Sequence, residues 1–479
     1  MSLTTLEPVP RLLSRVRAEL AAAFDCARPI RISRAPGRLD VMGGIAEYTG
    51  SIVCQATLDR AVAVALQPRA DRLLQIFSFN LLDENLPFTF NISIDHLAEA
   101  NVDALCKEFA APGRHWAAYI AGCLYQMHQN QLIDLNASST TGLNLAVLGT
   151  VPEGVGVGSS AALEVATMMN LIDHFSLRDK VDPMQIATMC QEVEHRIVGA
   201  PCGIVDPMSS CQGEADALLC VLCQPHEIRP TLVFPAGIRV VGINSNVRQS
   251  DGGMYDQTRC AAFMGHTIIV NKMRQMGQAG GRTLMSDPMG GHLANLDPDD
   301  YKRLFRPYLP QSIVGEKFLA DFGPTIDTAT TVDAKTNYHV LQATDHHVLE
   351  AGRVRHFVEL ISAAGRAPSR SREQGALLNK AGHLMYASHL SYTNDAKLGA
   401  DECDLLVRLA RDRERQGLYG ARITGAGGGG TVAVLCDINQ SADACIAELL
   451  AEYEKQIGKE PEAFLGSSPG AWHVGTVIL

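Results

Sequence analysis

Apolar residues recur at helical spacing close to the start of the chain. Leu12, Val16 and Leu20 stand four residues apart, so a helix would place them on one face. Pro10 comes just before this pattern, and proline is well tolerated in the first turn of a helix. The pattern predicts that an amphipathic helix spans residues 11–24.

Similar patterns predict helices and strands in both halves of the chain. We expect helices at 115–127, 159–176, 184–198, 256–275, 372–393 and 401–415, and strands at 61–67, 143–149, 217–222 and 239–245. Residues 28–44 predict a short strand followed by a Pro-Gly loop. Residues 276–346 are rich in Gly, Pro and Asp and lack periodicity, so we expect loops and short elements there.

The length of the chain indicates more than one hydrophobic core. Single cores stop growing at about 250 to 300 residues, and this chain has 479. The pattern of elements starts afresh past residue 215, so we expect two domains with a boundary near residue 225. Hydrophobic residues make up 46% and charged residues 19%, a balance typical of soluble globular proteins.

The charge balance favours small molecules as partners. The chain carries 41 Lys and Arg against 52 Asp and Glu, a net charge of -11, whereas nucleic acids and anionic membranes attract basic surfaces. No apolar run approaches the roughly 18 to 20 residues that cross a bilayer, and the first residues carry charges where a signal peptide is apolar. We expect a cytoplasmic protein that binds neither nucleic acid nor membrane, as a monomer or weak homo-oligomer.

The thirteen cysteines form no regular framework. Several of them, including Cys220 and Cys223, lie in apolar runs, where cysteine behaves as a small hydrophobic residue. No second pair or histidine cluster near these two completes a zinc site. We therefore expect both side chains in the core.

The stretch VPEGVGVGSSAALEVA at residues 151–166 carries the strongest chemical signal. Gly154, Gly156 and Gly158 leave the backbone without Cβ atoms, so successive N–H groups can converge on an anion. A helix beginning near Ser159 adds its positive end. The stretch predicts a phosphate site, although a flexible connector between strand and helix would also use glycine.

Two well-known phosphate loops are the alternatives. A P-loop needs Gly-Lys-Ser or Gly-Lys-Thr, and this segment has no lysine. A dinucleotide loop stays open on the residues alone, since Gly156, Gly158 and Ala161 satisfy G-x-G-x-x-A. Such a loop belongs to a first βαβ unit with an acidic residue about 20 positions on, whereas this stretch lies deep in the chain.

Two further segments accompany the glycine loop: APGRLDVMGGIAEYTGS from Ala35 and ITGAGGGGTVAVL from Ile423. With Pro152 and GVGSSA at 156–161, they resemble in order and spacing the three signature motifs of the GHMP kinases, the superfamily of galactokinase, homoserine kinase and mevalonate kinase. GAPCGIVDPM and GSSPGAWHVG resemble the kinase half of L-arabinokinases. That likeness covers nearly the whole chain.

The resemblance implies a two-domain α+β fold with the active site in the cleft between the domains. Residues 1–225 would form an N-terminal domain similar to ribosomal protein S5, which carries the phosphate loop. Residues 226–479 would form a C-terminal domain, a ferredoxin-like α/β sandwich. The last strand would return to the N-terminal domain.

The resemblance also implies a kinase that uses ATP and Mg²⁺. Asp206 matches the catalytic Asp, which would take the proton from the sugar hydroxyl. Arg38 matches the arginine that faces this Asp and would keep it ionised. Ser160 and Glu194 match the magnesium ligands. On the residues alone, Asp206 could be a turn residue, Arg38 part of a surface salt bridge and Glu194 a solvated helix residue.

The resemblance also implies a set of ATP-binding residues in three places. They are Gly154, Gly156, Gly158, Ser159, Ser160 and Ala161 in the phosphate loop, Trp116 and Tyr119 farther upstream, and Gly427 and Gly428 in the third motif. Trp116 and Tyr119 match the aromatic wall of the adenine pocket. Their spacing of three places both on one helix face, so core packing explains them equally well.

The segment that would contact the sugar departs from galactokinases. Their Gly-Glu-His-Thr-Asp corresponds to residues 43–47, where Gly44 and Ile45 replace the acidic and imidazole groups and Glu47 lengthens the Asp. The lost acid helps galactokinases to hold the exocyclic hydroxymethyl group. L-Arabinose has the ring stereochemistry of D-galactose without that group, and an apolar pocket selects by shape.

The predicted reaction is therefore phosphorylation of the anomeric hydroxyl of L-arabinose first and D-galactose second, with Glu47, Asp206 and Tyr255 as sugar contacts. Two rival functions stay open. One is a kinase for another acceptor, such as a uronic acid or a heptose phosphate, although no clear extra basic residue lies near Glu47. The other is a non-catalytic sugar sensor, against which the retention of Asp206, Arg38, Ser160 and Glu194 argues.

Overall fold

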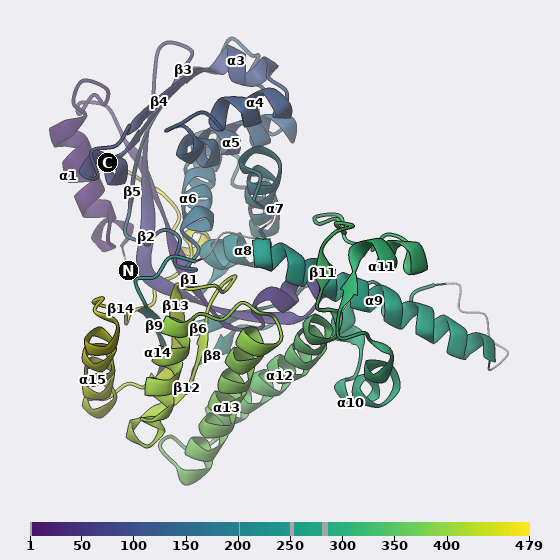
Figure 1. Ribbon diagram of the computed structural model, residues 1–479. Helices are drawn as coiled ribbons and strands as arrows, with labels where there is room; N and C mark the ends of the chain where they lie inside the picture. The colour runs from purple at the N-terminus through teal and green to yellow at the C-terminus, as the bar shows by residue number, and fades with distance from the viewer. Residues whose placement is uncertain (1, 201, 250–252, 280–285) are drawn as a thin grey trace.

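The computed structural model describes residues 2–200, 202–249, 253–279 and 286–479. Its elements form an N-terminal part and a C-terminal part, each built on a β-sheet, which lie one above the other in Figure 1. Within the described residues, no helix is both long and apolar enough to cross a membrane.

The sheet of the N-terminal part follows the path β15-β1-β2-β5-β3-β4, and β6 pairs with β2 and with the short strands β7 and β8. Neighbouring strands are antiparallel except for β3 and β5. The strands are β1 (Arg31–Met42), β2 (Ile52–Pro68), β3 (Leu73–Ser78), β4 (Thr89–Ser93), β5 (Leu143–Gly149), β6 (Ala217–Leu222), β7 (Glu227–Ile228), β8 (Leu232–Val233) and β15 (Val477–Ile478).

Helices cover both faces of this sheet because β2 is apolar on both sides. Val62 and Val64 belong to the main core, which includes α5, α6 and α7, whereas Ala63 and Ala65 pack in a second core with α1. Side chains alternate between the faces of a strand, so neighbouring residues reach different cores. The helices are α1 (Val9–Glu19), α2 (Phe79–Asp83), α3 (Ile94–Glu99), α4 (Val102–Phe109), α5 (His115–Gln129), α6 (Ser159–His174), α7 (Pro183–Val193) and α8 (Val205–Gln212).

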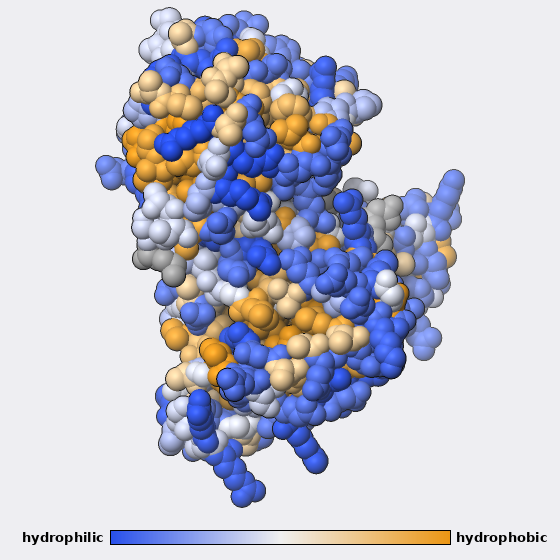
Figure 2. Space-filling view, turned by 90° about the vertical axis from the view of Figure 1, so that its left-hand side faces the viewer, coloured by the Kyte–Doolittle hydropathy of each residue, from blue (hydrophilic) through white to orange (hydrophobic). Residues whose placement is uncertain are grey.

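The C-terminal part holds an antiparallel sheet in the order β12-β13-β9-β14 with long helices against it. The strands are β9 (Ile238–Asn244), β12 (Leu418–Ile423), β13 (Thr431–Asp437) and β14 (Glu462–Phe464), and a separate pair is β10 (Ile313–Val314) and β11 (Asn337–Tyr338). The helices are α9 (Gly253–Ala279), α10 (Pro298–Asp300), α11 (Gly315–Phe322), α12 (Val340–Arg366), α13 (Arg372–Asn394), α14 (Asp401–Arg411) and α15 (Gln440–Ile457). The short helix α16 (Ala471–Val474) follows β14 and packs on α8 and β1 of the N-terminal part. Figure 2 shows that the face carrying α1 and α15 is mostly hydrophilic, with hydrophobic residues gathered in separate patches.

The first strand is longer than the sequence predicts. Instead of giving way to a Pro-Gly loop, β1 runs through Pro36 to Met42, with a register shift between Pro36 and Arg38. On its other side β1 pairs with β15 only at Arg31 and Ile32. Among the described residues, no strand pairs with Pro36 on that side, so no neighbouring strand needs the N–H group that proline lacks, and Pro36 is tolerated in β1.

The sheet pairings bear on the expected domain limits. β7 and β8 pair with β6, so the first sheet continues past residue 225 as far as residue 233. β15 pairs with β1 and brings the last strand back to the N-terminal part. The segment 276–346 holds the end of α9, short elements and the start of α12, and its residues 280–285 lie outside the described residues.

Candidate active site

A cavity of about 660 Å³ lies between the two parts, within the range of about 300 to 1,000 Å³ that is usual for small-molecule sites. The N-terminal part lines it with β1, the glycine loop and the first turns of α5, α6 and α8. The C-terminal part lines it with the start of α9 and the loop between β12 and β13. Segments far apart in the sequence therefore meet at this cavity.

The glycine loop has a left-handed backbone at three positions. Gly154, Gly156 and Gly158 have φ angles of 72°, 76° and 72°, a conformation that favours glycine. α6 begins at Ser159 directly after the loop, and no side-chain hydrogen bond caps it at Gly158. The N–H groups and the positive end of this helix lie at the cavity, where they suit an anion.

The third glycine motif packs directly on this loop. A Cβ atom at Gly425 would lie 2.9 Å from the carbonyl oxygen of Gly156, and a Cβ atom at Gly156 would lie 3.0 Å from the carbonyl oxygen of Thr424. Both positions therefore need glycine so that the two backbones can touch. This contact joins the C-terminal part to the loop that faces the anion site.

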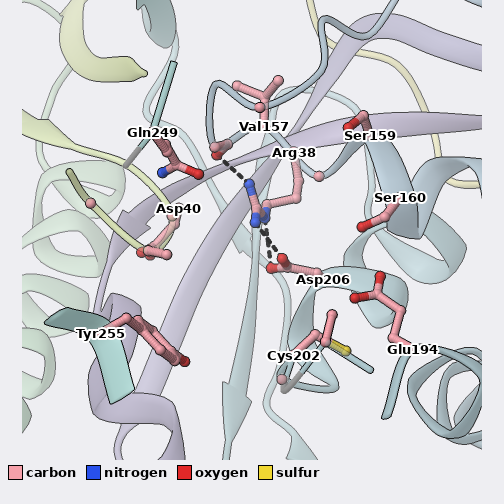
Figure 3. A pocket seen from close by; sticks show the side chains of 18 of the residues that line it. Arg38, Asp40, Val157, Ser159, Ser160, Glu194, Cys202, Asp206, Gln249 and Tyr255 are labelled. Carbon is pink, nitrogen blue, oxygen red and sulfur yellow. Dashed lines mark hydrogen bonds and ion pairs between the residues drawn. The ribbon is translucent and has the colours of Figure 1, made fainter. Parts of the chain in front are cut away.

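Arg38 and Asp206 pair at the centre of the cavity. Arg38 Nε donates to Asp206 Oδ1 at 2.6 Å, Nη2 donates to Oδ2, and Nη1 donates to the Gly156 carbonyl at 2.5 Å (Figure 3). Gln55 Nε2 donates to Asp206 Oδ1 at 2.8 Å. Burial raises the pKa of Asp206, but the charge and hydrogen bonds of Arg38 outweigh burial and hold this pKa below its ordinary value. The carboxyl group is ionised at neutral pH.

Ser160 and Glu194 face each other beside Asp206 (Figure 3). Ser160 lies in the first turn of α6, and Glu194 opens the π-helical turn that follows α7. Burial raises the pKa of Glu194, which is 5% exposed, and hydrogen bonds from Ser160 and Cys202 oppose that shift.

A hydroxyl and a carboxylate are the hard oxygen ligands that Mg²⁺ prefers, so Ser160 and Glu194 fit a magnesium site. Among the described residues, no group of three or more His, Cys, Asp or Glu side chains forms a metal cage. Phosphate and water oxygens would therefore complete the coordination, as is usual for Mg²⁺ at phosphate sites.

Two aromatic side chains and an acidic one also line the cavity. Trp116 and Tyr119 do so from the start of α5, and Trp116 packs against the main core as well. Their role in binding adenine stays a prediction. Glu47 accepts a hydrogen bond from the Val205 N–H at 3.2 Å. Burial, followed by the charge of Asp206, raises the pKa of Glu47 to about 7.

Three family models match separate parts of this chain. Residues 118–214 match the GHMP kinases N terminal domain, residues 375–455 match the GHMP kinases C terminal model, and residues 18–68 match the galactokinase galactose-binding signature. The chain belongs to the GHMP kinase superfamily. The first match contains the glycine loop and Asp206 of this GHMP kinase, and the third contains Arg38 and Glu47.

Curated relatives and solved structures agree with the family. This GHMP kinase is 34% identical to an L-arabinokinase of Arabidopsis thaliana over 96% of its own length, and it spans 48% of that relative. It is 28% identical to a galactokinase of Chloroflexus aggregans, with 90% of each chain covered. Its fold is similar to that of Lactococcus lactis galactokinase complexed with galactose, with a TM-score of 0.70, 20% identity and coverage of 98% and 100% of the two chains.

The structure of this GHMP kinase brings most of the predicted site residues to one cavity. Those that line it are Arg38, Glu47, Trp116, Tyr119, Gly154, Gly156, Gly158, Ser159, Ser160, Glu194, Asp206, Tyr255 and Gly427. Ala161 is buried in α6, and the Gly428 N–H donates to the Leu398 carbonyl at 2.7 Å, so neither lines the cavity.

The polar lining residues that were not predicted from the sequence include Asp40, Gln55 and Gln249. Asp40 is two residues from Arg38 in the first motif, a position that could have drawn attention to it. Gln55 and Gln249 carry no such signal, because only the folded chain brings them to Asp206 and to the glycine loop.

Proposed function

We propose that this chain is an ATP- and Mg²⁺-dependent sugar 1-kinase, which transfers the γ-phosphoryl group of ATP to the anomeric hydroxyl of L-arabinose and, less readily, of D-galactose. The observation that carries this proposal is the Arg38–Asp206 pair, because it links an ionised carboxylate to the glycine loop through Gly156. Similarity to an L-arabinokinase and to galactokinases supports sugars as the substrate class. A cytoplasmic location would supply ATP.

Asp206 would orient the sugar hydroxyl and take its proton. In the transfer the anomeric oxygen bonds to the γ-phosphorus, the bond between that phosphorus and the ADP oxygen breaks, and the hydroxyl proton leaves. Oδ1 of Asp206 accepts hydrogen bonds from Arg38 and Gln55, whereas Oδ2 accepts one from Arg38 alone. Oδ2 therefore keeps a lone pair for the hydroxyl, and Arg38 stabilises the charge that develops beside it.

The phosphate groups would lie at the glycine loop. N–H groups at the start of α6 would donate to phosphate oxygens, and Ser160 and Glu194 would hold Mg²⁺. When bound, Mg²⁺ neutralises negative charge on the β- and γ-phosphates. Trp116 and Tyr119 would flank the adenine ring.

The sugar would lie on the opposite side of Asp206, between Glu47 and Tyr255. Ile45 is 4% exposed and lines this region together with Gly44. An apolar side chain in this place offers no hydrogen bond to an exocyclic hydroxymethyl group. This supports a pentose as the first acceptor.

The test is sugar-dependent release of ADP by the purified chain with ATP, Mg²⁺ and a panel of pentoses, hexoses and uronic acids. We expect the highest kcat/KM with L-arabinose, D-galactose second, and phosphate attached to carbon 1 of the product. Asp206→Asn should lower kcat by about 100-fold or more. Asp345→Asn alters a buried Asp that pairs with Arg306 outside the cavity, so this control should keep its rate.

ATP consumption that no sugar stimulates would contradict the kinase proposal. A uronic acid or a heptose phosphate as the fastest acceptor would overturn the choice of L-arabinose and leave the kinase class standing.

A further inference from the structure

Gly44, at the position where galactokinases carry an acidic residue, has no room for a side chain. A Cβ atom there would overlap the Tyr392 hydroxyl and would lie 2.7 Å from Asp40 Oδ2 and 2.9 Å from Arg422 Nη2. These three side chains come from α13, β1 and β12. Together they fill the space into which a side chain at position 44 would point.

Asp40 is fixed in this cluster from both parts of the molecule. Its N–H group donates to Thr424 Oγ1 at 2.6 Å, and its Oδ1 accepts from the Gly44 N–H at 3.2 Å. Oδ1 also lies 3.3 Å from Arg422 Nη1. Arg422 is fully buried and packs over the Tyr392 ring at 4.9 Å. The orientation of the Asp40 carboxyl group is therefore determined before any ligand binds.

The second oxygen of this carboxyl group lacks a hydrogen-bond partner within the described part of the chain. Asp40 is 1% exposed, yet it lines the cavity together with Ile45 and Glu47. Figure 3 places Asp40 on the side of Tyr255, across the cavity from Ser160 and Glu194. A buried carboxyl oxygen without a donor is costly, so a donor supplied by the ligand would bind favourably there.

We propose that Asp40 Oδ2 accepts a hydrogen bond from a non-anomeric ring hydroxyl of the sugar and thereby determines which sugars bind. This inference rests on the proposed sugar kinase function. Arg422 is the positioning residue, because it lies beside Oδ1 and leaves Oδ2 without a partner among the described residues. A sugar without the matching hydroxyl leaves a buried acceptor unpaired and is rejected for that reason.

The test is a substitution cycle between Asp40 and the hydroxyls of the sugar. Asp40→Asn and the wild type are assayed with L-arabinose and with its 2-, 3- and 4-deoxy analogues. We expect one deoxy analogue to lower the wild-type kcat/KM about 10- to 100-fold, and Asp40→Asn to lower kcat/KM for L-arabinose to a similar extent. Asp40→Asn combined with that deoxy analogue should lower kcat/KM no further than either change alone.

Two variants complete the design. Arg422→Gln should raise the KM for L-arabinose with little change in kcat or in the KM for ATP, a split that general loss of folding would not produce. Asp345→Asn, the matched control outside the cavity, should keep the wild-type discrimination against every deoxy analogue. If Asp40→Asn does not fold, Asp40→Ser takes its place in the same cycle.

The outcomes separate this inference from the proposed function. If the loss of kcat/KM caused by Asp40→Asn multiplies with the loss caused by each deoxy analogue, Asp40 contacts none of these hydroxyls. That result would overturn the role of Asp40 and leave the proposed kinase function standing. A wild-type chain that phosphorylates no sugar would overturn both.

Discussion

Replacement of Arg38 by methionine would remove one charge from the centre of the site and keep much of the side chain's bulk. The guanidinium group makes two hydrogen bonds to Asp206 and one to the Gly156 carbonyl. The Arg38 side chain is 6% exposed and that of Asp206 is 26% exposed. Breaking a fully buried pair costs about 3 to 5 kcal/mol. Because Asp206 is partly solvated, we expect the free energy of unfolding to fall by about 2 kcal/mol.

The same substitution should shift the pH dependence of catalysis in one direction. Without Arg38 the effect of burial dominates, so the pKa of Asp206 rises. The acidic limb of kcat/KM, where Asp206 takes up a proton, should therefore move to higher pH. In the wild type this pKa is lowered by folding, so the pair stabilises the fold at neutral pH and ceases to do so as the pH falls through the pKa of the folded state. The Arg38→Met variant lacks the pair, so its free energy of unfolding should not show this decrease at acidic pH.

ADP release across the pH range and urea unfolding at neutral pH measure the two effects separately. Arg306→Met is the matched control, because Arg306 forms a two-point pair with Asp345 outside the cavity. We expect this control to lose stability without a shift of the acidic limb. If the acidic limb of kcat/KM does not shift in Arg38→Met, or shifts equally in Arg306→Met, Arg38 does not set the pKa of Asp206 and this prediction is refuted.

Three further substitutions test other parts of the site. Gly156→Ala would put a Cβ atom 2.7 Å from Gln249 Nε2 at a φ of 76°, so calorimetry should show weakened ATP binding. The control Gly237→Ala has a similar φ of 84° but open space around it, so this variant should keep its affinity for ATP. Equal losses of affinity in the two variants would contradict the packing argument. Glu194→Gln should raise the Mg²⁺ concentration for half-maximal rate about tenfold or more, and an unchanged Mg²⁺ titration would exclude Glu194 as a ligand. The folded-state pKa of Glu47 is raised from 4.5 to about 7, so ionisation of Glu47 should destabilise the fold as the pH rises from about 4.5 to 7. Glu47→Gln should remove this loss of stability, which amounts to about 3 kcal/mol at alkaline pH. Identical urea unfolding profiles of the wild type and the variant would refute this.

The sequence predicts helices well where their buried faces are apolar. The helices expected at 159–176 and 372–393 are confirmed as α6 and α13. α12 was not predicted, because its buried residues include His346 and Glu350. His346 Nδ1 lies 2.9 Å from the Ser391 hydroxyl, and Glu350 accepts from the Ser388 hydroxyl at 2.6 Å. These partners belong to α13, so the polar first half of α12 shows its buried face only when both helices are in place. Its second half does carry apolar residues at helical spacing, Val354, Phe357 and Ile361.

The glycine motifs were visible in the sequence for a local reason. A left-handed φ and a close backbone contact both favour glycine, so Gly154, Gly156 and Gly158 indicate the loop from the sequence alone. The role of Asp40 depends on Arg422, which follows it by 382 positions. No local pattern carries such a contact, and the structure was needed to find it.

The central claim is that the start of α6 holds the phosphates of ATP while Asp206 faces the anomeric hydroxyl of a sugar. A crystal structure of the chain with L-arabinose, Mg²⁺ and a non-hydrolysable ATP analogue tests it directly. The account predicts phosphate oxygens within hydrogen-bond reach of the N–H groups at 158–161, and Asp206 Oδ2 about 3 Å from the anomeric oxygen. Phosphates bound elsewhere, or a sugar whose anomeric oxygen turns away from Asp206, would contradict it.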